Sequence, residues 1–286
     1  MLKRQVRHQF APASTARVAL LASLVWGCDS RVTGSASLHD ACLAVGLCDK
    51  PRAEAITLDV LCDASRGSSC DRTTALAVID EALRGLGDRA GSTLRLWVMG
   101  ATGAETRTVS TIVVPAVRGS VRAQRNQIER WAASTRAALS LALEPTFAAS
   151  PARRSPIAES IAKVALASAR SPHRRVIVVG DARESSGLGD FECGSLDARS
   201  FRRALARRRI LGEASASGIQ FDFAFMTAGP VASRGCTVSM GRETAVRELW
   251  RSSLTSAGAA SVRFHSDAPG LDFAPPTTPA NPRSVP

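Results

Sequence analysis

Two aspartates each follow an apolar segment of the sequence. Their carboxylates are in positions where they could bind a cation or take part in catalysis. Asp63 follows the apolar segment 55–62 and opens a turn that contains three serines. Asp181 follows the apolar segment 176–179 after a single glycine. A carboxylate in such a place can hold a cation, act as a nucleophile or cap the segment that follows. The elements around the two aspartates decide between these roles.

Strand-like and helix-like segments alternate along the body of the chain. The alternation predicts an α/β fold: a three-layer, doubly wound, mainly parallel six-stranded sheet with helices on both faces. In such sheets ligands bind at the carboxyl ends of strands near the switch point in strand order, where Asp63 and Asp181 are expected. The predicted strands are 55–62, 93–99, 106–115, 176–179, 219–226 and 261–265, and the predicted helices are 71–87, 121–143, 156–169, 200–215 and 242–256.

Three motifs in chain order resemble the von Willebrand factor A (vWA) domain and its metal-ion-dependent adhesion site. That family has D-x-S-x-S after its first strand, and here Asp63 and Ser65 match it. It has a Thr before a Pro-Ile/Leu helix start, matched by Ser155, and an Asp after its fourth strand, matched by Asp181. Order and spacing agree over about residues 54–265.

The resemblance implies a protein-binding module that uses a hard divalent cation, Mg²⁺ or Mn²⁺, for recognition. Asp63, Ser65 and Ser155 would hold the ion directly, and Asp181 would hold it through a water molecule. One coordination position would stay open. In the family this position receives a carboxylate from a partner protein.

The sequence departs from the family pattern beside the expected site. Gly67 stands where the second serine of D-x-S-x-S is usual, so Ser68 or Ser69 would have to supply the missing hydroxyl. Arg66 and Arg183 are placed to bring a positive charge to the position of the ion. The resemblance therefore predicts a degenerate adhesion site, and leaves open whether an ion occupies it.

Other catalytic sites lack residues that they require. A phosphatase-type aspartate nucleophile needs a second acid two residues later, where this chain has Ser65. The chain has no G-x-S-x-G elbow, P-loop or dinucleotide motif. His173 and His265 have no paired acid motif and are expected to be loop histidines. The sequence favours a non-enzymatic binding protein; the alternatives are an exported hydrolase, with Asp63 and Asp181 holding a catalytic metal, and a structural envelope protein.

The N-terminal segment predicts export. Residues 1–27 combine four positive charges, no acid and a short apolar run that cannot span a bilayer. The run ends at Cys28 and resembles a bacterial lipobox except at Trp26, which implies lipid anchoring at Cys28 in the cell envelope; secretion after simple cleavage is the alternative. The net charge of +12 falls to +8 without this leader. An exported chain is not expected to bind nucleic acid, and its membrane contact would be the lipid anchor alone.

Six further cysteines in an exported chain predict disulfides. Six cysteines allow fifteen pairings, so their connectivity stays open, with Cys42–Cys48 and Cys193–Cys236 as suggested pairs. Free buried thiols are the alternative for some of them. The candidates are Cys42, Cys48, Cys62, Cys70, Cys193 and Cys236.

The domain itself carries two further features of interest. Helix 200–215 contains five arginines, which predicts either a solvated face with Phe201 and Leu205 buried, or a contact with an anionic envelope surface. The loop 183–196 is expected to act as a lid or a partner-contact loop. The predicted organisation is a signal peptide (1–27), a tether (28–53), a vWA-like domain (54–267) and a disordered Pro-rich tail (268–286).

Overall fold

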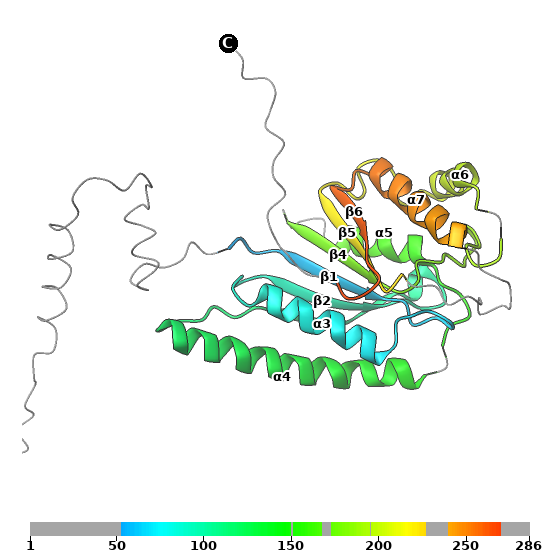
Figure 1. Cartoon of the computed structure of the whole chain (residues 1–286). Helices are drawn as coiled ribbons and strands as arrows, with labels where there is room; N and C mark the ends of the chain where they lie inside the picture. Colours follow the sequence, from blue (N-terminus) through cyan, green and yellow to red (C-terminus); the bar gives the residue numbers. More distant parts are fainter. Residues whose placement is uncertain (1–52, 150, 168–172, 195, 227–239, 270–286) are drawn as a thin grey trace, which may run out of the picture. The chain divides into compact units, whose positions relative to one another are not determined.

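The computed structural model describes residues 53–149, 151–167, 173–194, 196–226 and 240–269. In this part of the chain, six strands alternate with helices as the sequence predicts (Figure 1). The strands are β1 (Thr57–Cys62), β2 (Thr93–Val98), β3 (Arg107–Val113), β4 (Arg174–Val179), β5 (Ile219–Ala224) and β6 (Ser261–Phe264). The helices are α3 (Arg72–Leu86), α4 (Val121–Ala148), α5 (Ile157–Ala167), α6 (Ala198–Arg208) and α7 (Met240–Ser256), with a short 3₁₀ helix, η1 (Gly103–Glu105).

The strands form one sheet in the order β3-β2-β1-β4-β5-β6. All neighbouring strands are parallel except β3, which runs antiparallel to β2. Residues 99–106 join β2 to β3, and this link is too short for the crossover that a parallel pair needs. The prediction of an α/β, mainly parallel six-stranded sheet is therefore confirmed, and the sheet is mixed at its β3 edge.

Helices cover both faces of the sheet. On one face α3 and α4 pack over buried side chains of β1, β2 and β4. On the other face α5, α6 and α7 close a second apolar cluster that contains Trp97 and Trp250 (Figure 1). Because β1 and β4 lie at the centre and are covered on both faces, most of their residues are apolar, and the buried charges Asp59 and Arg175 form salt bridges with Arg95 and Asp222.

Helix α3 begins where its sequence predicts. The Asp71 carboxylate accepts a hydrogen bond from Thr74 N at 2.8 Å, and Thr74 Oγ1 accepts one from Asp71 N at 2.9 Å. This reciprocal capping box satisfies two backbone donors that the helix leaves free. Ile79, Leu83 and Leu86, all on the predicted apolar face, are buried against the sheet.

Helix α6 ends earlier than expected. The prediction extended it to residue 215, but it stops at Arg208 because Arg209 adopts a left-handed conformation with φ of 55°. The Arg209 N–H then bonds to the carbonyl groups of Leu205 and Ala206, as at a helix C-terminus that usually carries glycine. Phe201 and Leu205 are buried as predicted, so the arginine-rich face of α6 points outward.

No helix in the described ranges is both long and apolar enough to cross a membrane. The predicted signal peptide (1–27), and nearly all of the predicted tether (28–53) and tail (268–286), lie outside the described residues. So do Cys28, Cys42, Cys48 and Cys236. The predictions made for these parts stay predictions.

One disulfide lies in the described part of the chain and joins Cys62 to Cys70, with their Cα atoms 5.9 Å apart. Cys62 ends β1 and Cys70 precedes the cap of α3, and both are buried. Cys193 is also disulfide-bonded, to a cysteine outside the described residues. The prediction of disulfides is confirmed for Cys62, Cys70 and Cys193, while the pairings suggested for Cys42–Cys48 and Cys193–Cys236 stay predictions.

Replacing both Cys62 and Cys70 by alanine is expected to lower the free energy of unfolding by about 2.5 kcal/mol, because the bond closes a short loop in the unfolded chain. Urea unfolding of the wild type and of the double variant measures the difference. A reductant should lower the stability of the wild type more than that of the variant, which lacks the Cys62–Cys70 bond. Equal unfolding midpoints for the two proteins would contradict this expectation.

Candidate functional site

The candidate site lies at the carboxyl ends of the two central strands. The order of strands along the chain reverses between β1 and β4, so their shared edge is the switch point of the sheet. Asp63 follows β1 and its N–H donates to Val179 O at 3.0 Å, which ties it to the end of β4. Asp181 comes two residues after Val179, and Ser155 stands before α5. The structure therefore brings the sequence-predicted residues together from three separate segments.

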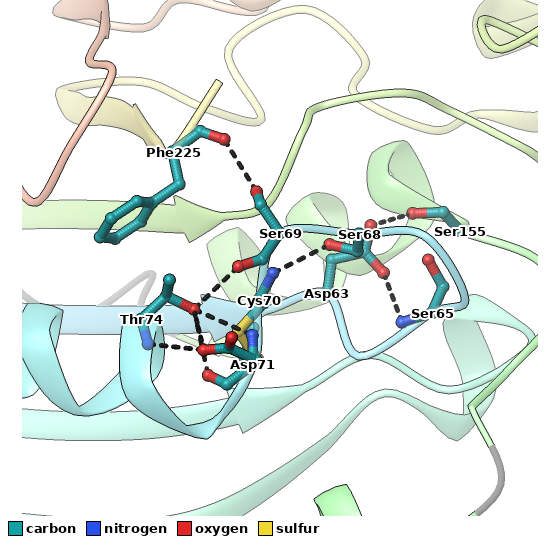
Figure 2. Close-up of a disulfide and its surroundings, with 10 residues drawn as sticks. Asp63, Ser65, Ser68, Ser69, Cys70, Asp71, Thr74, Ser155 and Phe225 are labelled. Atoms are coloured by element: carbon teal, nitrogen blue, oxygen red, sulfur yellow. Dashed lines mark hydrogen bonds between the residues drawn. A yellow bond between two sulfur atoms is a disulfide. The ribbon is translucent and has the colours of Figure 1, made fainter. Parts of the chain in front are cut away.

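Asp63 is the centre of the site (Figure 2). Its side chain is buried, and Ser155 Oγ donates to Oδ2 at 2.5 Å. Ser65 N donates to Oδ1 at 3.0 Å. Burial raises the pKa of Asp63, while hydrogen bonds from the hydroxyls of Ser155, Ser65 and Ser68 act in the opposite direction. One carboxylate thus gathers three hydroxyl groups around it.

The hydroxyl that the family pattern lacks at Gly67 comes from the next residue. Ser68 lies against Asp63, and its Oγ also accepts a hydrogen bond from Cys70 N at 3.3 Å (Figure 2). Ser69 turns away, because its Oγ donates to the Phe225 carbonyl at 2.8 Å. Of the two serines that the sequence offered, Ser68 is the one that reaches the site.

Gly180 allows this close packing. A Cβ atom at this position would lie 3.0 Å from Asp63 Cβ and 3.0 Å from Ser68 Oγ, and the backbone has a φ of 153°. Any side chain here would push the carboxylate and the serine apart. The glycine in the sequence Val-Val-Gly-Asp was available as a signal for this close approach.

Asp181 brings a second carboxylate to the edge of the site. Burial, followed by the nearby charge of Asp63, raises the pKa of Asp181 to about 7. Arg183 lies beside it, with Nε 3.7 Å from Asp181 Oδ2, and is itself buried. Arg66, the other arginine that the sequence placed near the site, is exposed. Only Arg183 therefore offers a buried positive charge here.

Glu184 is a part of this region that sequence reasoning missed. It is fully buried and its Oε2 accepts a hydrogen bond from Ala158 N at 2.8 Å, which caps the first turn of α5. Its Oε1 has no hydrogen-bond partner among the described residues, and burial raises the pKa of Glu184 to about 8. The next residue, Ser185, exchanges two backbone hydrogen bonds with Ser155. Residues 184 and 185 together position Ser155 against Asp63.

The loop 183–196 does not have the properties of a lid. Leu188 and Phe191 are buried, and the Phe191 ring packs edge-on against Phe201 and Trp250. Trp250 Nε1 also donates to the Ala182 carbonyl at 2.8 Å. Apolar side chains of the loop join the core, which does not favour a lid, and the alternative of a partner-contact loop stays a prediction.

His265 lies in a loop after β6, as the sequence predicts, but it pairs with an acid that the sequence did not indicate. Its Nε2 lies 2.7 Å from Asp222 Oδ1, and Asp222 also binds Arg175 at 2.6 Å and Arg263 at 2.9 Å. Burial would raise the pKa of Asp222, but Arg175, His265 and Arg263 together hold it below its usual value. His173 likewise pairs with an acid, Glu54, at 2.7 Å. The sequence could not show these pairs, because they join residues far apart in the chain or on different strands.

The oxygen atoms at Asp63 suit a hard divalent cation. A carboxylate with three hydroxyls, and a second carboxylate nearby, matches the ligand preference of Mg²⁺ and Mn²⁺. Asp63 is buried and Asp181 lies at the edge of the site beside Arg183, so a bound cation would favour the ionised forms of these two carboxyl groups. Among the described residues, no group of three or more His, Cys, Asp and Glu forms a metal site, so any ion here would depend on hydroxyl oxygens.

Neither a protein-family model nor a curated protein matches the chain. Among solved structures it is similar to the conserved hypothetical protein BatB from Bacteroides thetaiotaomicron, with 11% identity and a TM-score of 0.36, over 75% of this chain and 91% of that one. It is also similar to proximal thread matrix protein 1 from the mussel byssus, with 10% identity and a TM-score of 0.32, over 80% of this chain and 47% of that one. Similarity at this level assigns neither a family nor a function.

The burial of Glu184 predicts a pH dependence of stability. Its pKa rises from 4.5 to about 8 on folding, so its protonated form stabilises the fold below pH 4.5, and this contribution is lost as the pH rises towards 8. Glu184→Gln stays neutral throughout, and its stability relative to the wild type should increase between pH 4.5 and 8. Urea unfolding across this range, in EDTA, measures the difference. The exposed Glu129→Gln is the control, and its difference from the wild type should not change with pH. If the difference in unfolding free energy between Glu184→Gln and the wild type were also constant across this range, the raised pKa of Glu184 would be contradicted.

Proposed function

We propose that this chain is a cation-dependent, non-enzymatic protein-binding module of the vWA-like type. The observation that carries the proposal is the convergence of Ser65, Ser68 and Ser155 on the buried carboxylate of Asp63, at the switch point of the sheet. These four residues would hold Mg²⁺ or Mn²⁺ directly, and Asp181 would hold it through water. A bound ion would supply an open position for a carboxylate of the partner protein.

The site departs from the family pattern in two respects, and both are expected to lower its affinity for a divalent cation. Ser68 replaces the usual serine from one position later in the turn, and Arg183 lies 3.7 Å from the Asp181 carboxylate. A guanidinium so close to a ligand of the ion opposes a second positive charge. We therefore propose binding in the millimolar range.

A non-enzymatic role is proposed because no histidine in the described part of the chain is hydrogen-bonded to a serine of the site. His173 pairs with Glu54 and His265 with Asp222, so neither histidine is hydrogen-bonded to a serine of the site. The Ser155 hydroxyl donates to Asp63, whose raised pKa reflects burial. General esterase and phosphatase assays with Mn²⁺ test this proposal, and metal-dependent turnover lost in Asp63→Asn would contradict it.

Cation binding should raise the melting temperature of the protein. A tenfold excess of Mn²⁺ over its dissociation constant stabilises the folded state by about 1.4 kcal/mol, or about 3–5 °C for a domain of this size. Asp63→Asn should abolish the shift without lowering the melting temperature in EDTA, since it removes a buried charge. The exposed Asp88→Asn is the matched control and should keep the shift. No shift in the wild type at 10 mM Mn²⁺ would reject the cation site.

We also propose that the chain is exported and lipid-anchored at Cys28 in the bacterial cell envelope. The buried Cys62–Cys70 disulfide supports an oxidising compartment. Mass spectrometry of the mature protein should find an N-terminal Cys28 that carries a lipid, and Cys28→Ala should release the protein from the membrane fraction. A mature N-terminus elsewhere, or an unmodified Cys28, would contradict lipid anchoring.

A further inference from the structure

A pocket of about 240 Å³ opens beside Asp63, at the carboxyl ends of β1 and β2. Its wall combines Ala64 of the Asp63 turn, Met99 after β2, and Ala149 and Ala152 after α4. These side chains are small or apolar, and no aromatic ring lines the pocket. The volume lies below that of sites for cofactors or drug-sized molecules, so the pocket suits a single side chain or a few atoms.

Four exposed arginines lie at or near this pocket, and we refer to them as the arginine rim: Arg66, Arg107, Arg153 and Arg154. Arg107 lines the pocket itself. Arg66 N donates to Ala152 O at 2.8 Å, which places the Arg66 turn beside Arg153 and Arg154. No side chain of the rim forms a salt bridge or a hydrogen bond with another residue in the described ranges.

The acids nearby form no salt bridge with this rim in the described ranges. Asp63 and Asp181 are largely buried, and Asp181 faces Arg183. Glu105 also lines the pocket, but its Oε2 accepts a hydrogen bond from Ala101 N at 2.9 Å and it forms no salt bridge with Arg107. Within the described ranges, the edge therefore presents guanidinium groups without a salt-bridge partner around a partly apolar cavity, whose polar lining residues are Glu105, Arg107 and Thr146.

We propose that the pocket and the arginine rim bind an acidic segment of a partner protein. An apolar side chain of the segment enters the pocket, and flanking Asp or Glu side chains pair with Arg107, Arg153 and Arg154. The proposal deepens the proposed function, because a further carboxylate of the same segment would complete the cation site at Asp63. A concave, partly apolar surface without aromatic rings favours a protein chain over nucleic acid bases, which would need stacking partners.

The test uses three labelled peptides and fluorescence anisotropy on the full chain in 50 mM NaCl. The probe is Glu-Glu-Leu-Glu-Glu, and its analogues replace Leu by Ser or every Glu by Lys. We expect the Leu peptide to bind most tightly and the Lys peptide not to bind. Binding should weaken in 300 mM NaCl, since it depends on charge.

Charge reversal locates the binding surface. The triple variant Arg107→Glu, Arg153→Glu and Arg154→Glu should bind the Leu peptide at least tenfold more weakly. The control reverses three exposed arginines at the other end of α4 (Arg122→Glu, Arg125→Glu and Arg130→Glu), which changes the net charge equally and should alter the affinity less than twofold. Ala149→Phe should fill the pocket and reduce binding of the Leu peptide to the level of the Ser peptide.

The outcomes separate this proposal from the cation site. Loss of binding in the rim variant in EDTA, without any effect of Mn²⁺ on melting, would support the rim and reject the cation site. If Mn²⁺ raises the melting temperature but the rim and control variants bind the peptide equally well, the proposed role of the arginine rim would be rejected and the cation site retained. Rim-dependent binding of a ten-nucleotide oligothymidylate, or of vesicles with 30% phosphatidylglycerol, with no peptide binding would overturn the assignment to a protein partner.

Discussion

The hydrogen bond from Ser155 to the buried carboxylate of Asp63 is the interaction on which the rest of the site depends. A carboxylate removed from water is costly unless hydrogen bonds replace its hydration. In this protein the hydrogen bonds come from residues of the Asp63 turn and from Ser155, next to the end of β4. The Cys62–Cys70 disulfide closes the Asp63 turn, Gly180 lets β4 approach it, and Glu184 caps the helix that follows Ser155. The switch point of the sheet is thus a polar cluster held by packed backbone.

The charge within this cluster links its stability to its proposed role. Asp63 and Glu184 are buried and Asp181 is largely so, and in each of them burial raises the pKa of the carboxyl group. Arg183 offsets part of their charge at the edge of the cluster. A divalent cation would offset more of it, but it would compete with Arg183 for Asp181. This competition explains why we propose a weak and degenerate site.

The sequence predicted the strands and most helices because the central strands are mostly apolar and helices such as α3 carry apolar residues at helical spacing. It also predicted that Asp63, Ser155 and Asp181 meet, since the carboxyl ends of parallel strands share one edge. The end of α6 was missed, because Arg209 adopts a conformation that sequence patterns assign to glycine. Glu184, the Asp222 pairs and the pocket were missed because each depends on long-range packing that no local pattern encodes.

The proposed cation site and the arginine rim lie at one edge of the sheet, so a single acidic partner could reach both. The central claim is that oxygen atoms around Asp63 bind a divalent cation. Crystals grown with Mn²⁺ and measured for anomalous scattering test it most directly. We predict an anomalous peak within bonding distance of the Asp63 carboxylate and of the Ser155 hydroxyl. A structure at saturating Mn²⁺ with no peak there, and with Ser155 still hydrogen-bonded to Asp63, would contradict the claim.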